Sequence, residues 1–580
     1  MSESKKVDRR RFITYAAGIA GTAVIVGGGV YLLTQGPTAT TTVTTTSTTT
    51  GTTTATSTAT TTATSTATTT ITATPPPPSK IVLTHIATEE LTSLDPHFSS
   101  GAGGDFSMSI NLYDRLFRPT IKDGVEMPEG DLVTTYTVSP DGLKYTMQLQ
   151  KGVKFHDGTE LTADDVAWSF DRYLQYGNGF SFLYTGYIDP GMTKALDKYT
   201  VEFNLKKPYT ALPASLCRFA VLNRKLVEPH INDGPQGHDW LHLNDAGSGP
   251  YKLKEWRPRE ETILVKFDDY WRGWGAGNRV TEFHFMPVIE VATMKTLLLS
   301  GKADLDDGWM GTDAYKALEG KGNIVLERHP WIQERVLTMN NQRKPFDDIH
   351  VRKAVSWAID YDKYNTIIEW NGQQAKGPVP IGLWGHNPNV FQYHYDVNKA
   401  KEELALSKYS AQELAEPIVV PVHNDKTKLT MLFVSEYLKA IGLNIEIEMT
   451  TWTKLIGSFG QGPQAAPPLL WWGNTVKFPS PDAYLYSVFH KSTWGTWSGQ
   501  AWYDNPEVNT LLEQSRAETD TNKLLQLYAT IQEKIVADAP MVWLSNPYCV
   551  IARQSWVKGF TFRSTLGEYL WIPNFTIEPH

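Results

Sequence analysis

Hydrophobic and polar residues alternate in several stretches of this chain, a period that predicts half-buried β-strands. These predicted strands lie at residues 144–149, 200–205 and 443–448. Other stretches repeat hydrophobic residues every three or four positions, which predicts amphipathic helices. These predicted helices lie at residues 162–174, 351–358 and 524–535. The sequence therefore predicts a folded part that contains both strands and helices.

The stretch from Asp131 to Leu174 contains the clearest local signals. Ser139 to Gly142 predicts a turn, because proline presets φ and glycine tolerates positive φ. Thr162 is placed to cap a helix, and Asp165 offers a carboxylate to the free amides of its first turn.

A catalytic or metal-binding role is the alternative interpretation for His156 with Asp157, or for the pair Asp164 and Asp165. Turn and capping roles account for the same residues, and no second histidine stands at ligand spacing from His156. The structural interpretation is therefore favoured.

Composition and charge argue against several classes of function. The length of 580 residues allows about three or four domains, and the net charge of −8 argues against a nucleic-acid partner. Cys217 and Cys549 are the only cysteines, which allow one disulfide but no zinc or iron–sulfur motif. No cofactor is expected. Nineteen tryptophans suit either a packed core or stacking on sugars and rings.

Residues 1–36 carry an export signal. Asp8 to Thr14 resembles the twin-arginine pattern, and the uncharged run from Phe12 to Leu33 is about long enough to span a bilayer. The basic residues before the run predict a cytoplasmic N-terminus. Because no small-residue cleavage site directly follows, we favour an uncleaved membrane anchor over a cleaved signal, which would release a secreted protein.

Residues 37–79 predict a disordered stalk. Threonine fills 25 of the 37 positions from Thr38 to Thr74, and Pro75 to Pro78 follow as a stiff spacer. Such tracts are typical of O-glycosylated stalks, here with a reach on the order of 100 Å. By analogy, a membrane-anchored body on a threonine-rich stalk suggests an archaeal surface protein.

The segment from Ser139 to Phe170 also resembles the signature of a known family. These are the extracellular solute-binding proteins of peptide/nickel-type ABC importers, the dipeptide- and oligopeptide-binding proteins of family 5. Further segments resemble the motifs of this family along the whole globular part. They include Leu94–Pro96, Gly247–Leu253, Asn340–Tyr361 and Ala539–Leu544.

The resemblance implies an α/β fold with two lobes, the type II periplasmic-binding-protein fold of the large dipeptide-binding type. Residues 80–336 and 545–580 would form the first lobe, and residues 337–544 the second. A ligand would be buried as the lobes close by a hinge motion. The liganded form would deliver its cargo to ABC permease subunits in the membrane, without catalytic residues.

The ligand segment departs from the pattern of peptide-binding members. There, an aspartate pairs with the α-amino group of the ligand, whereas this chain has Lys477 or Thr475 at that position, depending on the alignment of residues 470–482. A buried ammonium without a counter-charge is costly. A peptide with a free amino terminus therefore requires that Asp482 or another acid substitutes.

The same region is rich in tryptophan, which packs a core or stacks on pyranose rings. An oligosaccharide ligand is slightly favoured over an oligopeptide, and nickel is disfavoured because no His or Cys cluster is present near this segment. The six tryptophans are Trp452, Trp471, Trp472, Trp494, Trp497 and Trp502. The candidate ligand-binding residues are Trp471, Trp472, Asn474, Lys477, Trp494, Tyr113 and Asp95.

Two functions of other classes remain as alternatives. A secreted sugar-active enzyme would need two carboxylates about 5–10 Å apart, and no pair is marked by its sequence context. A structural surface protein would need only the stalk and a folded body. Hydrolysis of an oligosaccharide would favour the enzyme, whereas reversible binding without turnover would favour the importer component.

Overall fold

The computed structural model describes residues 80–98, 104–475, 477–562, 564 and 570–580. Lys80–His580 forms one compact unit. The predicted export signal or anchor and the predicted stalk lie outside the described residues. Within the described part of the chain, the helices are too short or too polar to cross a membrane.

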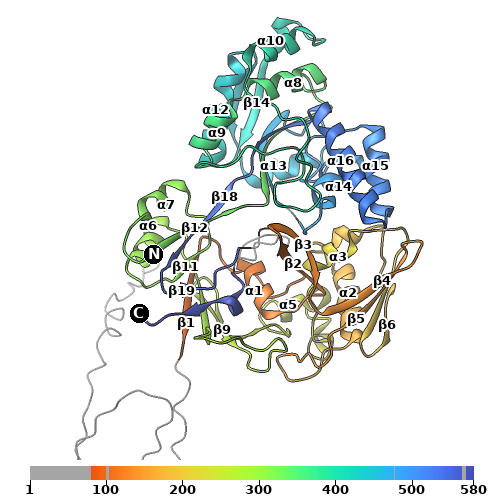
Figure 1. The fold of residues 1–580 in the computed structure, drawn as a ribbon, viewed down its shortest axis with the longest axis vertical. Helices are drawn as coiled ribbons and strands as arrows, with labels where there is room; N and C mark the ends of the chain where they lie inside the picture. The colour runs from red at the N-terminus through yellow and green to blue at the C-terminus, as the bar shows by residue number, and fades with distance from the viewer. Residues whose placement is uncertain (1–79, 99–103, 476, 563, 565–569) are drawn as a thin grey trace, which may run out of the picture. The chain divides into compact units, whose positions relative to one another are not determined.

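A seven-stranded mixed sheet contains strands from both the N-terminal and the C-terminal part of the described chain. Its strand order is β12-β18-β11-β1-β10-β9-β8, with β10 and β11 parallel to the central β1. The strands are β1 (Val82–Ala87), β8 (Tyr251–Arg257), β9 (Glu261–Lys266), β10 (Glu282–Pro287), β11 (Leu305–Asp306), β12 (Ile324–Pro330) and β18 (Tyr548–Gln554). The sheet therefore combines a strand from residue 82 onward with one from residue 548 onward (Figure 1).

A four-stranded antiparallel sheet contains two of the predicted strands. Its order is β4-β5-β7-β6, from strands β4 (Val133–Val138), β5 (Lys144–Leu149), β7 (Thr200–Asn204) and β6 (Thr193–Asp197). Helix α2 (Ala163–Tyr176) follows β5 and buries Val166 and Phe170 as its hydrophobic period predicts. The strands at 144–149 and 200–205 and the helix at 162–174 are thus confirmed within one or two residues.

Local contacts support the structural interpretation of Asp165, in the first turn of α2, and of His156. The Asp165 carboxylate accepts hydrogen bonds from the Thr162 amide at 2.9 Å and hydroxyl at 2.8 Å, which confirms the capping prediction. The His156 ring contacts the Asp245 carboxylate at 2.7 Å and the Gly249 carbonyl at 2.9 Å. Among the described residues, no group of three His, Cys, Asp or Glu side chains is placed to hold a metal ion.

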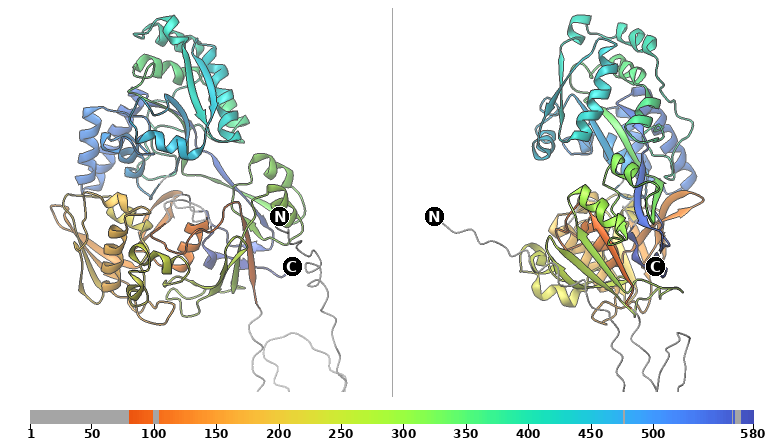
Figure 2. Two further views of the ribbon diagram at one scale, coloured as in Figure 1. Left: turned by 180° about the vertical axis from the view of Figure 1, so that it is seen from behind. Right: turned by 90° about the vertical axis from the view of Figure 1, so that its left-hand side faces the viewer.

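A three-stranded sheet, β16-β13-β17, carries three of the predicted site residues, Trp471, Trp472 and Asn474. It consists of β13 (Gln333–Met339), β16 (Leu469–Thr475) and β17 (Met541–Ser545). The parallel pair β14 (Pro417–Val422) and β15 (Asn444–Met449) adjoins it and confirms the strand predicted at 443–448. Figures 1 and 2 show helices α8 (Ile349–Ala358), α9 (Tyr361–Ile367), α10 (Val397–Ala405) and α12 (Asp425–Lys439) gathered near β14, away from the four-stranded sheet.

The remaining elements of the described chain are two further strand pairs, β2-β3 and β19-β20, and the other helices. The remaining strands are β2 (Phe117–Lys122), β3 (Val125–Gly130), β19 (Val557–Lys558) and β20 (Thr576–Ile577). The remaining α-helices are α1 (Gly104–Leu112), α3 (Leu212–Ser215), α4 (Arg224–Val227), α5 (His238–Leu241), α6 (Val291–Leu299), α7 (Thr312–Leu318), α11 (Ala411–Leu414), α13 (Trp452–Phe459), α14 (Asp482–Phe489), α15 (Pro506–Ala517) and α16 (Thr521–Asp538). Short 3₁₀ helices span Ser181–Tyr184, Leu216–Arg218, Glu228–His230, Pro235–Gly237, Lys491–Thr493 and Ile572–Asn574.

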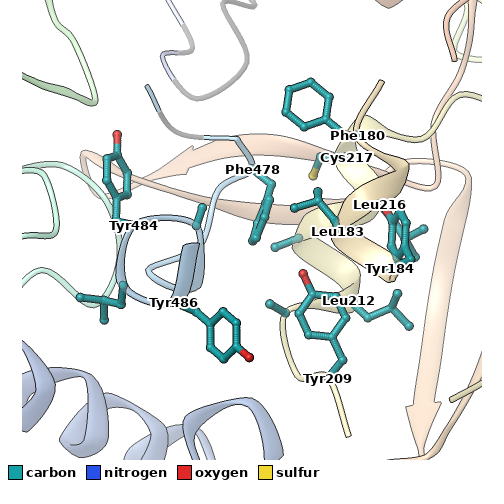
Figure 3. Packing of buried hydrophobic residues seen from close by; sticks show 14 of the residues in the cluster. Phe180, Leu183, Tyr184, Tyr209, Leu212, Leu216, Cys217, Phe478, Tyr484 and Tyr486 are labelled. Atoms are coloured by element: carbon teal, nitrogen blue, oxygen red, sulfur yellow. The ribbon is translucent and has the colours of Figure 1, made fainter. Parts of the chain in front are cut away.

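The segment after β16 packs against residues far away in the sequence. Figure 3 shows Phe478 and Tyr486 facing Leu183, Tyr209 and neighbouring apolar side chains, all members of one hydrophobic cluster. The predicted lobe boundary after residue 336 falls inside β13, and the boundary after residue 544 falls at the end of β17. The division into two lobes stays a prediction.

Candidate functional site

The two adjacent tryptophans of β16 point to opposite faces of the three-stranded sheet, as successive side chains of a strand do. The Trp471 indole donates a hydrogen bond to the Tyr364 hydroxyl at 2.9 Å. The Trp472 ring stacks on Trp452, with ring centroids 5.3 Å apart and planes 9° from parallel. The structure therefore brings Trp472 and Trp452 together and separates Trp471 from them.

The other predicted tryptophan positions do not complete this stack. Trp494 lies beside Trp502 at a centroid distance of 5.5 Å, and its indole donates to the Tyr503 carbonyl at 2.9 Å. Trp497 lies under the Lys477 ammonium, 4.7 Å from the ring centroid. The six tryptophans thus occupy separate places rather than one platform, and a ligand-binding role for Trp494 stays a prediction.

Asn474 lies opposite an acid that the sequence reasoning missed. In the register of β13 and β16, Glu334 is the cross-strand partner of Asn474, and Val336 is the partner of Trp472. Both Glu334 and Asn474 are buried. The available signal was the polar run Gln333 to Arg335, which begins the strand between Ile332 and the apolar residues Val336 and Leu337.

Lys477 is buried just beyond β16, with 4% of its surface exposed. Burial lowers the pKa of its ammonium to about 7, and the positive charge of Arg218 acts in the same direction. Asp482 partly offsets both effects. The Arg218 guanidinium also donates a hydrogen bond to the Lys477 carbonyl. An ammonium of this kind is a poor substitute for the acid of peptide-binding members.

The Asp482 carboxylate forms an ion pair with Arg516. Its carboxylate receives two hydrogen bonds from the Arg516 guanidinium, at 2.7 and 2.8 Å, and both side chains are buried. Arg516 also donates to the Tyr187 hydroxyl at 2.7 Å. Asp482 therefore contributes to an internal ion pair, which leaves it poorly placed to serve a ligand.

Asp95 and Tyr113 lie in the interior, in contact with protein groups. Although burial by itself raises the pKa of Asp95, hydrogen bonds from His238 and the charge of Arg172 hold it well below its ordinary value. Arg172 reaches both carboxylate oxygens, at 3.2 and 2.8 Å. Tyr113 donates to the Leu94 carbonyl at 3.2 Å. Their predicted ligand-binding role stays a prediction, and these contacts account for both residues structurally.

A cavity of about 730 Å³ separates two distant segments of the chain. Aromatic rings and hydroxyl groups dominate its walls, and one wall includes Trp497, the ring under Lys477. The lining residues come from Phe182–Lys207 on one side and from Tyr486–Arg516 on the other.

A smaller cavity of about 140 Å³ is rich in cations. Arg328, Arg335 and Lys426 line it together with a single acid, Glu369. Arg335 and Lys426 lie 3.6 and 3.8 Å from the two Glu369 oxygens. Five aromatic side chains also line it: Trp309, Tyr315, Trp331, Trp370 and Tyr548. Three cations against one carboxylate leave an excess of positive charge that suits an anionic group.

Comparison with known proteins gives a consistent result. A family model described as bacterial extracellular solute-binding proteins, family 5, matches residues 127–496. The probable D,D-dipeptide-binding periplasmic protein DdpA of Escherichia coli K12 is 27% identical over 483 residues, covering 82% of this chain and 90% of that protein. The dipeptide-binding protein of the same strain is 27% identical over 495 residues, covering 81% and 90%.

A solved structure agrees with these sequence relatives. The ABC transporter-associated periplasmic binding protein DppA of Helicobacter pylori, in complex with the peptide STSA, superposes with a TM-score of 0.70 at 26% identity. The match covers 86% of this chain and 98% of that one. The mixed α/β fold is therefore the fold of these binding proteins.

Proposed function

Because the chain belongs to the bacterial extracellular solute-binding proteins of family 5, we propose that it captures peptides outside the cytoplasm for an ABC importer. Its role is reversible binding without turnover, followed by delivery to permease subunits in the membrane. Peptide replaces oligosaccharide as the favoured ligand because the relatives above are named for peptides. Nucleic acid is not a partner.

The cation-rich cavity is the observation that carries this proposal. Its walls come from both sides of the predicted lobe division, since Arg328 belongs to β12 whereas Lys426 belongs to α12. A peptide carboxylate placed there would accept charge-assisted hydrogen bonds from two arginines and a lysine. Closure of the predicted lobes around such a ligand would bury the ion contacts and hold the peptide in place.

Trp472, Asn474 and Lys477 are the predicted site residues that we retain in this proposal. Trp472 with Trp452 offers an apolar surface to the peptide, and Asn474 offers amide groups to its backbone. We further propose that the predicted lobes, residues 80–336 with 545–580 and residues 337–544, provide the hinge. The predicted anchor and glycosylated stalk would keep the binding unit near its permease.

The test uses a peptide and its amide. We expect trialanine to bind about tenfold more tightly than trialanine amide, since the amide lacks the terminal charge. Lys426→Gln should reduce that ratio, measured by isothermal titration calorimetry. Lys428→Gln is the matched control, because Lys428 is exposed on the same helix and does not line the cavity. Equal affinity for acid and amide in the wild-type chain would contradict the carboxylate site.

A further inference from the structure

Glu334 is a buried acid that does not line the cation-rich cavity proposed above to bind the carboxylate of the peptide. One per cent of its surface is exposed, and among the described residues its Oε1 atom has no hydrogen-bond partner. Other buried acids are held firmly: Asp95 and Asp482 by arginines, Asp114 by hydroxyl and indole donors, and Asp306 by a phenol and a backbone amide. Glu334 lacks such contacts within that part of the chain.

The position of Glu334 on β13 determines the face of the sheet on which it lies. Cross-strand partners share a face of the sheet, so Glu334 and Asn474 lie on the face that also carries Trp472. The Trp472 Nε1 atom likewise has no hydrogen-bond partner among the residues described. An acceptor and a donor without protein partners therefore lie on the same face, close to the stacked Trp452 and Trp472 rings.

The cationic side chains of Arg335 and Lys477 contact groups other than Glu334. Arg335 belongs to the opposite face, where it contacts Glu369 and lies 5.4 Å from the centroid of the Trp471 ring. Lys477 lies over Trp497. The charged groups that shift the pKa of Lys477 are Arg218 and Asp482, not Glu334. None of the ion pairs found between described residues includes Glu334. Its charge is thus left without compensation by the described protein groups.

An isolated buried carboxylate is unfavourable, and it either binds a proton or finds a cation. Burial raises the pKa of Glu334 well above its ordinary value, which agrees with the absence of a protein cation beside it in the described structure. A ligand ammonium at this place would supply the missing charge and an N–H donor together.

We propose that Glu334 pairs with the α-ammonium group of the bound peptide. This inference rests on the proposed function and deepens it. It explains how a chain with Lys477 or Thr475 at the aspartate position of the ligand segment, residues 470–482, would recognise a free amino terminus. The acid is displaced from that segment to the neighbouring central strand, directly opposite Asn474.

The experiment compares free and blocked amino termini. Dialanine to pentaalanine and their N-acetyl derivatives are titrated into the purified chain, into Glu334→Gln and into Glu446→Gln. The third variant is the control, because Glu446 is an exposed acid on β15. We expect the wild type and the control to prefer the free amine by about 30-fold or more, as expected for loss of a buried charged partner. In Glu334→Gln the preference should fall below about threefold.

A second measurement needs no variant. Burial raises the pKa of Glu334, and an ammonium beside the carboxylate would lower it, so binding of a free-amine peptide should release protons. Calorimetry in two buffers of different ionisation enthalpy measures this release. N-acetylated peptides should release none, because they bring no cation to the carboxyl group.

The outcomes separate the two proposals. If Glu334→Gln binds peptides but keeps the full preference for a free amine, or if the wild type binds both forms equally, the role of Glu334 is refuted while peptide binding stands. Proton release that is the same for free and acetylated peptides also refutes it. If the wild-type chain binds no peptide of either kind, the proposed function fails and this inference fails with it.

Discussion

Replacement of Lys477 by methionine should stabilise the protein in a strongly pH-dependent way. In the unfolded chain this ammonium keeps its proton up to its ordinary pKa of 10.5, whereas in the folded chain the pKa is about 7. Between these values the unfolded state binds more protons, so the stability of the wild type rises with pH across that window. Below pH 7 the folded protein bears the full cost of a buried charge.

The size of the effect follows from the two pKa values. The difference between 10.5 and about 7, at about 1.4 kcal/mol per pKa unit, corresponds to about 5 kcal/mol below pH 7. At pH 9 about 2 kcal/mol of this cost remains, because the folded protein has already released the proton. Lys477→Met should therefore gain about 2–3 kcal/mol more at pH 6 than at pH 9.

Urea denaturation followed by tryptophan fluorescence at several pH values measures this difference. Lys491→Met provides the control, because Lys491 is exposed in a short helix of the same region. A gain for Lys477→Met that is equal at pH 6 and pH 9, or a loss of stability at pH 6, would refute the reasoning. Either result would mean that the ammonium keeps a stabilising partner in the folded protein.

Three further substitutions separate structural from ligand-binding roles. Asp95→Asn leaves the Arg172 guanidinium buried without its carboxylate and should cost about 3–5 kcal/mol in chemical denaturation, with unchanged peptide affinity of the folded protein. Trp452→Ala removes a half-exposed ring from the stack on Trp472 and should weaken peptide binding about fivefold in calorimetry. Arg516→Lys replaces the two-pronged contact with Asp482 and should lower the melting temperature in differential scanning calorimetry.

Much of the fold could be predicted from local patterns. The period of two at residues 144–149 and the cap at Thr162 depend on neighbours in the sequence, and both appear in the structure. The helical face at 524–535 is confirmed except at Leu527, which is half-buried while Tyr528 is buried instead. Such signals need no knowledge of distant contacts.

The site was less accessible to sequence reasoning because it depends on register and pairing across the chain. Composition and spacing grouped six tryptophans, but strand alternation sends Trp471 and Trp472 to opposite faces. Arg172, the ion-pair partner of Asp95, lies 77 positions away in the sequence, so this pair has no local signal. The position of Glu334 opposite Asn474 depends on the pairing of β13 with β16, which local patterns do not indicate.

The most direct test of the account is a binding assay of the purified chain against alanine peptides and maltooligosaccharides. Peptide at about 100 times its dissociation constant should stabilise the fold by about 2.7 kcal/mol, seen as a raised melting temperature, and the peptide should be recovered intact. Stabilisation by maltooligosaccharides alone, or hydrolysis of either ligand, would contradict the assignment of this chain as a peptide-binding component of an importer.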